Sequence, residues 1–293
     1  MTQILIHPKY HQNSISVHVT LVQYPSLLLL TEILDWTQLF PWVESQCHLS
    51  VFTFGYANHN GPHTWKVLYP DSNGSNQSPI DITSRLTIVV QPSKPLQWSG
   101  YNKAPLSATI SNYGNSGLQF YFHYLLHSSN DIIIVGFLTN TYDLHSMVFH
   151  WGHSNEEGSE HTIDYVRYPM ELQVVHLKRG RLYLQITNAE NPYLDQIVTN
   201  LWRINRPGTK VHIPPFPLEW IFTPFENNYY TYNGSLTQPP CSEIVVWIIQ
   251  PEPIAISSSQ VAQFRKICSA DGPILQNCRP VQRLNERDVY FYE

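Results

Sequence analysis

From Phe52 onward, the chain alternates between short runs of β-branched and aromatic residues and clusters of Gly, Pro, Asn and Ser. Runs of this kind predict β-strands, and the clusters between them predict turns. The predicted strands are Leu86–Val90, Ala108–Ser111, Leu118–Tyr124, Ile132–Gly136, Ser146–Trp151, Glu171–Leu177, Leu182–Thr187, Tyr229–Tyr232 and Val245–Ile249. The pattern therefore predicts a mainly β protein with many strands joined by turns.

Helical spacing of apolar residues is clearest in two segments after Phe52. In Pro192–Leu201 the apolar side chains recur three or four positions apart, which indicates a helix. Ser257–Ile267 opens on Ser residues that are able to cap a helix. No internal repeat or low-complexity linker divides this region, so we expect a single domain at 52–293, preceded by an extension at 1–51.

The extension has no single interpretation. An apolar stretch from Val17 to Leu30 is interrupted by Gln23 and Pro25, and it begins too far from Met1 for an ordinary signal peptide. It is also too short and too interrupted for a membrane span. Three explanations stay open: an internal or atypical secretion signal, an added helix packed on the domain, or a start codon that is not the native one.

Composition and charge narrow the class of partner. The chain is 42% hydrophobic and 13% aromatic, with 22 Pro against 13 Gly, as expected for a β-rich protein with ordered loops. Its formal net charge is −5, and it has no run of Lys or Arg that would track a phosphate backbone. We therefore expect no nucleic-acid partner.

Sequons and cysteines bear on the cellular location. Asn73, Asn76 and Asn233 each begin an N-glycosylation tripeptide. The four cysteines, which lack the CxxC spacing of a structural zinc site, are Cys47, Cys241, Cys268 and Cys278. These features favour an extracellular location slightly, and a cytoplasmic one stays open.

Several segments in order resemble the alpha-class carbonic anhydrases. The matching segments are Asn60-Gly-Pro-His-Thr-Trp65, Asn76-Gln-Ser-Pro-Ile-Asp-Ile82, Phe149-His-Trp-Gly152, Gly158-Ser-Glu-His-Thr162, Glu171-Leu-Gln-Val-Val-His176, Tyr232-Asn-Gly-Ser-Leu-Thr-Gln-Pro-Pro-Cys-Ser-Glu243 and Arg279-Pro-Val-Gln282. The resemblance covers roughly Phe52 to Phe291. It implies a single α+β domain with a large, twisted, mostly antiparallel central sheet and a few short peripheral helices.

The resemblance also implies a zinc site of three histidines, two of them from a His-x-His pair whose members share one face of a strand. Aligning Phe149-His-Trp-Gly152 with the family's motif places His150 on the second ligand position and Val148 on the first. Gln173 falls on the third position, where a neutral amide replaces an imidazole. His145, His153 and His176 lie out of phase with these positions, so we expect them on the surface or in other hydrogen bonds.

Further site positions follow from the same resemblance. Thr237 and Glu160 match the pair that orients a zinc-bound hydroxide, although a buried hydrogen bond alone would also account for them. Glu171 matches the carboxylate that supports the third ligand, and the amide N–H of Gln173 is expected to satisfy it. The altered positions are Ser146, beside the first ligand, and Asn115, at the proton-shuttle position. The residues that match the family's apolar pocket are Val175, Leu236 and Trp247.

Two ligand positions without histidine favour a carbonic anhydrase-related protein, in which zinc is absent or weakly held and carbon dioxide hydration is slight. Such a protein would bind a protein or small-molecule partner through its surface or vestigial cleft. An active or weakly active zinc hydratase and a secreted matrix or adhesion module remain the alternatives. The segment between His176 and Leu182 is shorter than in the family, which would reshape the pocket wall.

Disulfide pairing in related extracellular members suggests two candidates here. Those members often pair the cysteine at the position of Cys241 with one that precedes the Gln-Ser-Pro-Ile motif, where this chain has none. Cys47 is then a candidate partner from further upstream. Cys268 and Cys278 are the second candidate pair, across the loop between them.

Overall fold

The computed structural model describes most of the chain after Phe54 and one segment before it. The described residues are 14–22, 54–114, 118–123, 134–135, 142–177, 192–221 and 224–293, of which 14–22, 118–123, 134–135, 143 and 177 are described by their backbone. The strands are β1 Ser14–Val22, β2 Asp81–Ile82, β3 Ile88–Val90, β4 Gln97–Trp98, β5 Ser107–Asn112, β6 Leu118–His123, β7 Ile134–Val135, β8 Asp143–Trp151, β9 Thr162–Ile163, β10 Met170–Leu177, β11 Lys210–Ile213, β12 Tyr229–Gly234, β13 Val245–Ile249, β14 Ile254–Ala255, β15 Cys268–Ser269, β16 Gly272–Pro273 and β17 Tyr290–Tyr292.

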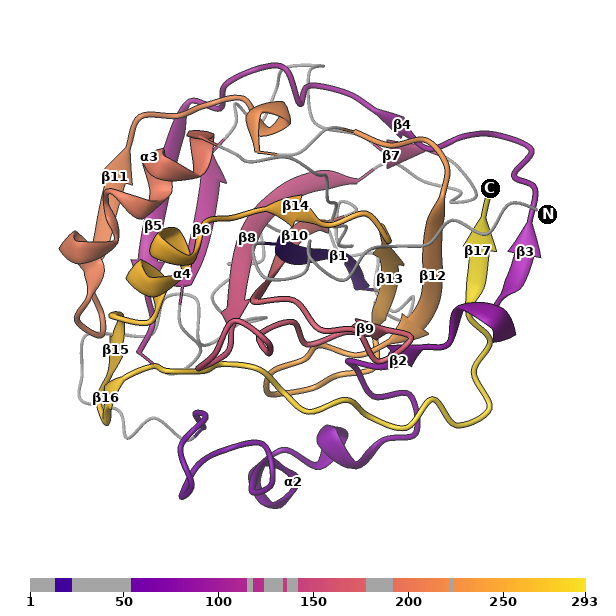
Figure 1. Cartoon of the computed structure of the whole chain (residues 1–293), viewed down its shortest axis with the longest axis horizontal. Coiled ribbons are helices and arrows are strands. Elements are labelled where there is room, and N and C mark those ends of the chain that lie inside the picture. Colours follow the sequence, from indigo (N-terminus) through magenta and orange to yellow (C-terminus); the bar gives the residue numbers. More distant parts are fainter. Residues whose placement is uncertain are drawn as a thin grey trace, which may run out of the picture.

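One large sheet dominates the fold (Figure 1). Its strands lie in the order β11-β5-β6-β8-β10-β1-β13-β12-β17-β3, and β14 pairs with β1 off this path. Neighbours in the sheet are antiparallel except for β1 with β10 and β17 with β3. The mainly β, mostly antiparallel single domain expected from the sequence is therefore confirmed.

Most predicted strands are present with shifted ends. The strand β13 has the same first and last residues as the predicted strand Val245–Ile249. The strand β8 ends at Trp151 as predicted but begins at Asp143, three residues before the predicted Ser146. The predicted Leu86–Val90 begins instead with a 3-10 turn at Ser84–Leu86, so the strand β3 is shorter. The predicted Leu182–Thr187 lies outside the described residues.

The helices are short and lie around the periphery of the molecule (Figure 1). The α-helices are α2 Trp65–Leu68, α3 Asp195–Val198 and α4 Ser258–Phe264, and the 3-10 helices are Pro70–Asn73, Ser84–Leu86, Pro192–Leu194, Leu201–Ile204 and Leu218–Trp220. Ser257 caps α4 in a reciprocal box with Gln260, as the Ser-rich start predicts. None of the described helices is long and apolar enough to cross a membrane.

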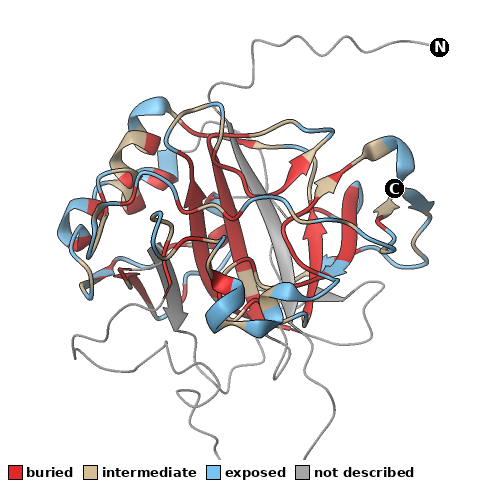
Figure 2. Cartoon of the chain, turned by 90° about the horizontal axis from the view of Figure 1, so that it is seen from below, coloured by how far each residue is buried: buried red, intermediate tan, exposed pale blue. Residues whose placement is uncertain are grey.

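Two apolar layers pack against the opposite faces of the sheet. Leu172 and Val174 of β10 belong to the larger core, which also contains Phe264 of α4. Trp247 of β13 belongs to a smaller core on the other face, against which Val175 packs. All residues of β13 are buried, as are most described residues of β8 and β10, whereas the peripheral helices keep an exposed side (Figure 2).

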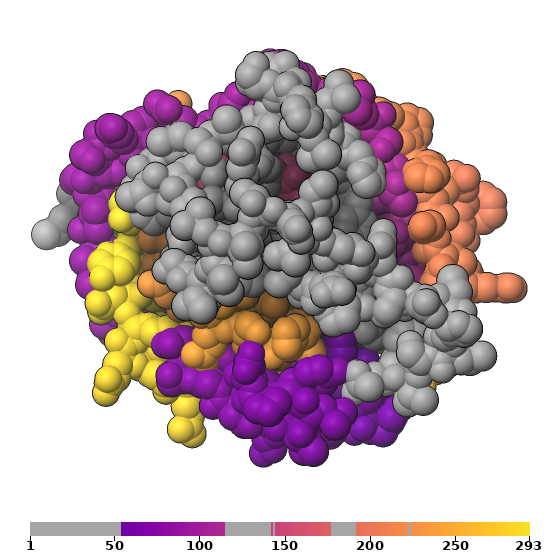
Figure 3. All heavy atoms as spheres, turned by 180° about the vertical axis from the view of Figure 1, so that it is seen from behind, coloured from indigo at the N-terminus to yellow at the C-terminus, as the bar shows by residue number. Residues whose placement is uncertain are grey.

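The segment that starts at Phe54 packs against the C-terminal half of the chain. On the face opposite to that of Figure 1, these indigo and purple residues lie beside the orange ones (Figure 3). The side chain of Gln77 makes part of this contact, because its Nε2 donates to the carbonyl oxygen of Cys241 at 3.1 Å and to Glu243 Oε1 at 2.9 Å. Two of the family-like segments that lie far apart in the sequence are thereby held together.

The candidate disulfide between Cys268 and Cys278 is absent, because both residues have free thiols. The thiol of Cys278 instead donates to the carbonyl oxygen of Gly158 at 2.7 Å, which turns it away from a partner sulfur. Cys241 is also a free, buried thiol, and its candidate partner Cys47 lies outside the described residues.

Candidate functional site

The predicted ligand positions lie on two adjacent strands, β8 and β10, which pair directly. Glu171 is opposite His150, and Gln173 is opposite Val148. Because directly opposite residues share a face and the side-chain period of a strand is two, all four residues are on one face of the sheet. Each is 6% exposed or less, so the sequence alignment does bring these positions together in a buried site.

His150 presents one unused ring nitrogen. Its Nδ1 lies 2.8 Å from the carbonyl oxygen of Asn277, which can only accept, so Nδ1 carries the proton. In the neutral ring Nε2 is then a lone-pair nitrogen, and it is buried without a hydrogen-bond partner. This is the tautomer of a neutral imidazole that ligates a metal or accepts a proton.

Gln173 uses its amide differently, as a donor. Its Nε2 lies 2.8 Å from Glu160 Oε2 and 2.9 Å from Glu171 Oε1, so the two N–H groups are directed at two buried carboxyl groups. The contact with Glu171 is the one expected from the sequence. Thr237 Oγ1 is a further neighbour of the same nitrogen at 3.5 Å.

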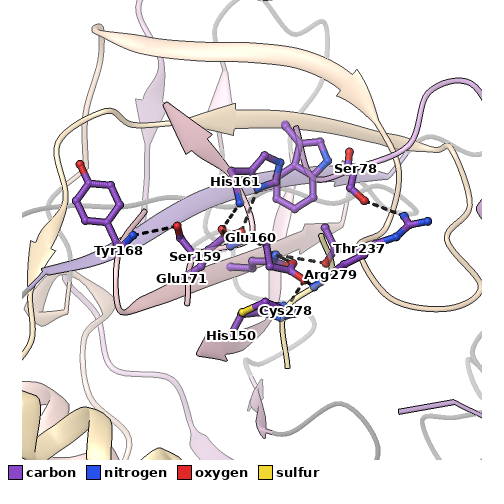
Figure 4. Close-up of polar contacts among 12 residues, drawn as sticks. Ser78, His150, Ser159, Glu160, His161, Tyr168, Glu171, Thr237, Cys278 and Arg279 are labelled. Carbon is purple, nitrogen blue, oxygen red and sulfur yellow. Dashed lines mark hydrogen bonds and ion pairs between the residues drawn. The ribbon is translucent and has the colours of Figure 1, made fainter. Parts of the chain in front are cut away.

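Glu171 is held by four donors. Its Oε2 accepts from the backbone N–H groups of Glu160 and His161 at 2.7 and 2.8 Å, while Oε1 lies 3.2 Å from His161 Nδ1 and accepts from Gln173. His161 continues the network, since its Nε2 lies 2.7 Å from the hydroxyl of Tyr232. Figure 4 shows Glu171 and His161 pointing toward each other beside Glu160.

Glu160 is fully buried and lies between His150 and Thr237 (Figure 4). Its Oε1 accepts from the backbone N–H of Arg279 at 2.8 Å and lies 3.4 Å from His150 Nδ1, and its carboxyl group hydrogen-bonds the Thr237 hydroxyl. Burial raises the pKa of Glu160 to about 7, and the neighbouring Glu171 adds to the rise while His150 and the hydrogen bonds oppose it. The predicted Thr237–Glu160 contact is present.

The remaining predicted positions divide into two groups. Val175 and Leu236 pack against the smaller core, which contains Trp247, so the residues matched to an apolar pocket belong to one apolar cluster. Ser146 is buried in β8 two positions from Val148, with its hydroxyl 3.0 Å from His145 Nδ1. Asn115, matched to the shuttle position, lies outside the described residues.

The three out-of-phase histidines have other contacts, as strand parity predicts. His145 lies next to the hydroxyl of Ser146, and His153 is 2.8 Å from Glu157 on the surface. His176, on the opposite face of β10 from Gln173, has its Nε2 2.6 Å from the hydroxyl of Tyr101. None of these contacts brings an imidazole to His150.

The donor set was compared with what a zinc site requires. Zinc in a protein is held by three or four Cys, His, Asp or Glu ligands. Among the described residues, no group of three or more such side chains is placed to hold a metal ion. His150 Nε2 suits zinc, but Val148 offers no lone pair and the Gln173 nitrogen is occupied as a donor. The described residues therefore do not fit the three-histidine site.

Two residues of the site were not singled out from the sequence, although both lie in the matching segments. His161 links Glu171 to Tyr232, and the guanidinium of Arg279 donates to Gln77 Oε1 and the carbonyl oxygen of Ser78, both at 2.8 Å. A third residue, Asn277, lies two positions before Arg279, which begins the last matching segment. Its carbonyl oxygen accepts a hydrogen bond from His150 Nδ1. Their polar side chains beside buried motif residues were the available signal.

The sheet and the buried His–Glu–Thr arrangement define a carbonic anhydrase-type domain, and sequence comparison agrees. Residues 60–293 match the family described as eukaryotic-type carbonic anhydrase, and the chain belongs to that family. Among its curated relatives is carbonic anhydrase 1 of Mus musculus, which is 36% identical over 260 residues, covering 80% of this chain and 97% of the relative.

Proposed function

We propose that this protein is a carbonic anhydrase-related protein that hydrates carbon dioxide slowly or not at all and acts by binding a protein or small-molecule partner. The observation that carries the proposal is the Gln173 amide, which donates to Glu160 and Glu171 at 2.8 and 2.9 Å. These hydrogen bonds supply both buried carboxyl groups with a donor at the position where the family resemblance implies a zinc ligand.

The chemistry of an amide explains why this network opposes zinc. A ligand must offer a lone pair, and the amide nitrogen of Gln173 has none available. Its two N–H groups instead donate hydrogen bonds to the two carboxyl groups. Turning the amide to offer its oxygen would leave Glu160 and Glu171 without this donor. Stranding a buried acceptor costs about 1–3 kcal/mol, and more for a charged one.

A weakly active zinc hydratase is the second candidate, and one observation favours it. His150 Nε2 is buried, unpartnered and in the metal-ligating tautomer, and the Thr237–Glu160 pair that would orient a nucleophile is in place. Zinc bound there would supply an activated water when loaded. Thr237 and Glu160 would then orient that water, and His150 would bind the metal.

The first experiment separates these two candidates on the unmodified chain. The protein is purified with zinc available, its metal content is determined by elemental analysis, and carbon dioxide hydration is followed by stopped flow. We expect substoichiometric zinc and hydration close to the uncatalysed rate. Stoichiometric zinc together with sulfonamide-sensitive hydration would overturn the proposal in favour of the hydratase.

The second experiment restores the missing ligands. The double variant Val148→His with Gln173→His should bind zinc at one ion per chain and regain some hydration, since Glu171 and the Thr237–Glu160 pair are already placed. The matched control adds His150→Ala, which should remove most of the gained zinc, because two ligands hold zinc poorly. A folded double variant that stays metal-free would show that more than the ligands has changed.

A further inference from the structure

The strand β1 comes from a part of the chain that the family match does not include. The match covers residues 60–293, whereas β1 is Ser14–Val22. Nevertheless β1 lies inside the sheet, parallel to β10 on one side and antiparallel to β13 on the other (Figure 1). A segment from the N-terminal extension therefore occupies a central position between two strands of the family domain.

The sequence of β1 fits this position independently of its backbone path. Apolar and polar residues alternate strictly through Ser-Ile-Ser-Val-His-Val-Thr-Leu, the pattern of a strand with two unlike faces. Val17 and Val19 are in register with Leu172 and Val174, which belong to the larger core. All four positions are thus apolar and share the core face of the sheet.

The polar positions of β1 fall in register with the candidate site. His18 is the register partner of Gln173, and Thr20 is the partner of both Val175 and Trp247. A slip of one residue would place the apolar positions of β1 on the site face and the polar ones on the core face. In the observed register, the apolar positions of β1 are on the core face and its polar positions are on the site face.

Without β1, the sheet would contain a slot. Neighbouring strands lie about 4.8 Å apart, so β10 and β13, which flank β1, are separated by about twice that distance and cannot pair with each other. Both would present unpaired backbone groups along the slot, at the wall that carries Gln173 and Trp247. Such an edge readily accepts another extended segment.

We propose that residues 14–22 are a complementing strand that fills this slot in cis and closes the wall of the candidate site. The slot is a groove that binds an extended segment with apolar residues at alternate positions. In this chain, residues 14–22 are that segment. Displacing the strand opens the site beside Gln173, Val175 and Trp247. The inference does not depend on whether the site holds zinc.

Engineered cysteine pairs in the full-length chain test the register. Ser14 is the antiparallel partner of Ala255, and both are small residues at the end of the strand pair. Antiparallel partners have Cα atoms about 4.5–5.5 Å apart, within the range that a disulfide spans. We expect Ser14→Cys with Ala255→Cys to form an intramolecular disulfide on mild oxidation, identified by peptide mapping under non-reducing conditions.

The matched control moves one cysteine by a single position. Ile15→Cys with Ala255→Cys places the two residues on opposite faces, so its yield should be at least about tenfold lower. Equal yields from the two pairs, or no disulfide from either, would overturn the proposal. A disulfide that links two chains instead would show that the strand is exchanged between copies and does not act in cis.

Hydrogen exchange on the unmodified chain gives a second measurement that does not depend on how the variants fold. The backbone N–H groups of residues 15–21 should exchange at least about 100-fold more slowly than in a free peptide of the same sequence, because a strand paired on both sides opens only with the sheet. Exchange at the rate of the free peptide would contradict the complementing strand.

Discussion

Two cross-strand pairs, only two residues apart on β8 and β10, have opposite characters. In the pair His150–Glu171, the histidine keeps an unpartnered Nε2 and the carboxylate accepts four hydrogen bonds. In the pair Val148–Gln173, the valine has no polar group and the Gln173 nitrogen donates to two carboxyl groups. His150 of the first pair therefore has a nitrogen without a hydrogen-bond partner, whereas the amide N–H groups of Gln173 in the second pair are both used in hydrogen bonds.

The difference shows how a buried polar site satisfies its carboxyl groups when an amide stands where the family resemblance implies an imidazole. Buried acceptors require donors, whatever chemistry first supplied them. At the second pair, the Gln173 amide donates to both Glu160 and Glu171, in addition to the backbone N–H groups that these carboxyl groups accept from. At the first pair the polar requirement of His150 is met only at Nδ1.

The largest expected effect is on stability when Gln173 loses its amide. Gln173→Met keeps the side-chain size but removes both hydrogen bonds, leaving Glu160 and Glu171 with one donor fewer each. We expect the free energy of unfolding to fall by about 2–4 kcal/mol. Urea denaturation, followed by Trp fluorescence and far-UV circular dichroism, measures the change.

Leu172→Met is the matched control for this variant. Leu172 is the neighbouring residue on the same strand, fully buried on the opposite face, and the exchange conserves volume without touching a hydrogen bond. Its cost should stay below about 1.5 kcal/mol. If both variants lose the same free energy, the hydrogen bonds of Gln173 do not carry the site and the contrast between the two pairs fails.

A smaller effect is expected at the first pair, when Asn277 is truncated. Asn277 Oδ1 accepts from the backbone N–H of Trp151 at 2.7 Å, and its Nδ2 donates to the carbonyl oxygen of Phe149 at 2.8 Å, on either side of His150. Asn277→Ala removes both bonds, and we expect a loss of about 1–3 kcal/mol in the same urea assay.

Asn277→Asp sharpens this prediction, because its protonated carboxyl group keeps an acceptor for Trp151 and has a single O–H in place of the amide N–H that donates to Phe149. It should rank between the wild type and Asn277→Ala when measured at a pH at which the new carboxyl group is protonated. A loss greater for Asn277→Ala than for Gln173→Met would reverse the comparison and make the His150 end the structurally dominant one.

The family resemblance placed the ligand positions on the sequence. The motif around Trp151 put His150 on the second position, and the period of two sets Val148 on the same face, as their pairing with Glu171 and Gln173 has it. His145, which was expected out of phase, lies without a register partner at an irregularity of β8 and beside Ser146. The contact between Gln173 and Glu171 was also predicted, because the resemblance makes Glu171 the carboxylate that supports the third ligand position.

The sequence did not predict the long-range parts of the arrangement. The contact of Gln173 with Glu160 depends on how the loop after β8 folds back, which no local pattern encodes. The strand β1 overlaps the apolar stretch from Val17 to Leu30, for which an added helix was one of three explanations, although its residues alternate from Ser14 to Leu21. Its place between β10 and β13 follows from pairing with residues more than 140 positions away.

The smallest expected effect concerns the access of solvent to the surroundings of His150. The reactivities of three thiols, those of Cys241, Cys268 and Cys278, measure it. Cys278 donates to the carbonyl oxygens of Trp151 and Gly158 beside this end, and burial raises its pKa well above the usual range. Burial likewise raises the pKa of Cys241 to about 12, from 9. The thiolate is the reactive form, so at pH 8 only about one Cys241 thiol in ten thousand is ionised.

Cys268 and Cys278 are both partly exposed, but the raised pKa of Cys278 should make it react more slowly with iodoacetamide than Cys268 does. Buried Cys241 should be alkylated only after unfolding in urea, as peptide mass mapping would show. The sign of the pH dependence follows from the raised pKa of Cys241. Between about pH 9 and 12 the unfolded chain ionises this thiol before the folded one does, so its contribution to stability falls as pH rises. If Cys278 in the folded protein is alkylated as fast as Cys268, the surroundings of His150 are open to solvent. The Nε2 of His150 would then be hydrated, and the contrast between the two pairs would fail.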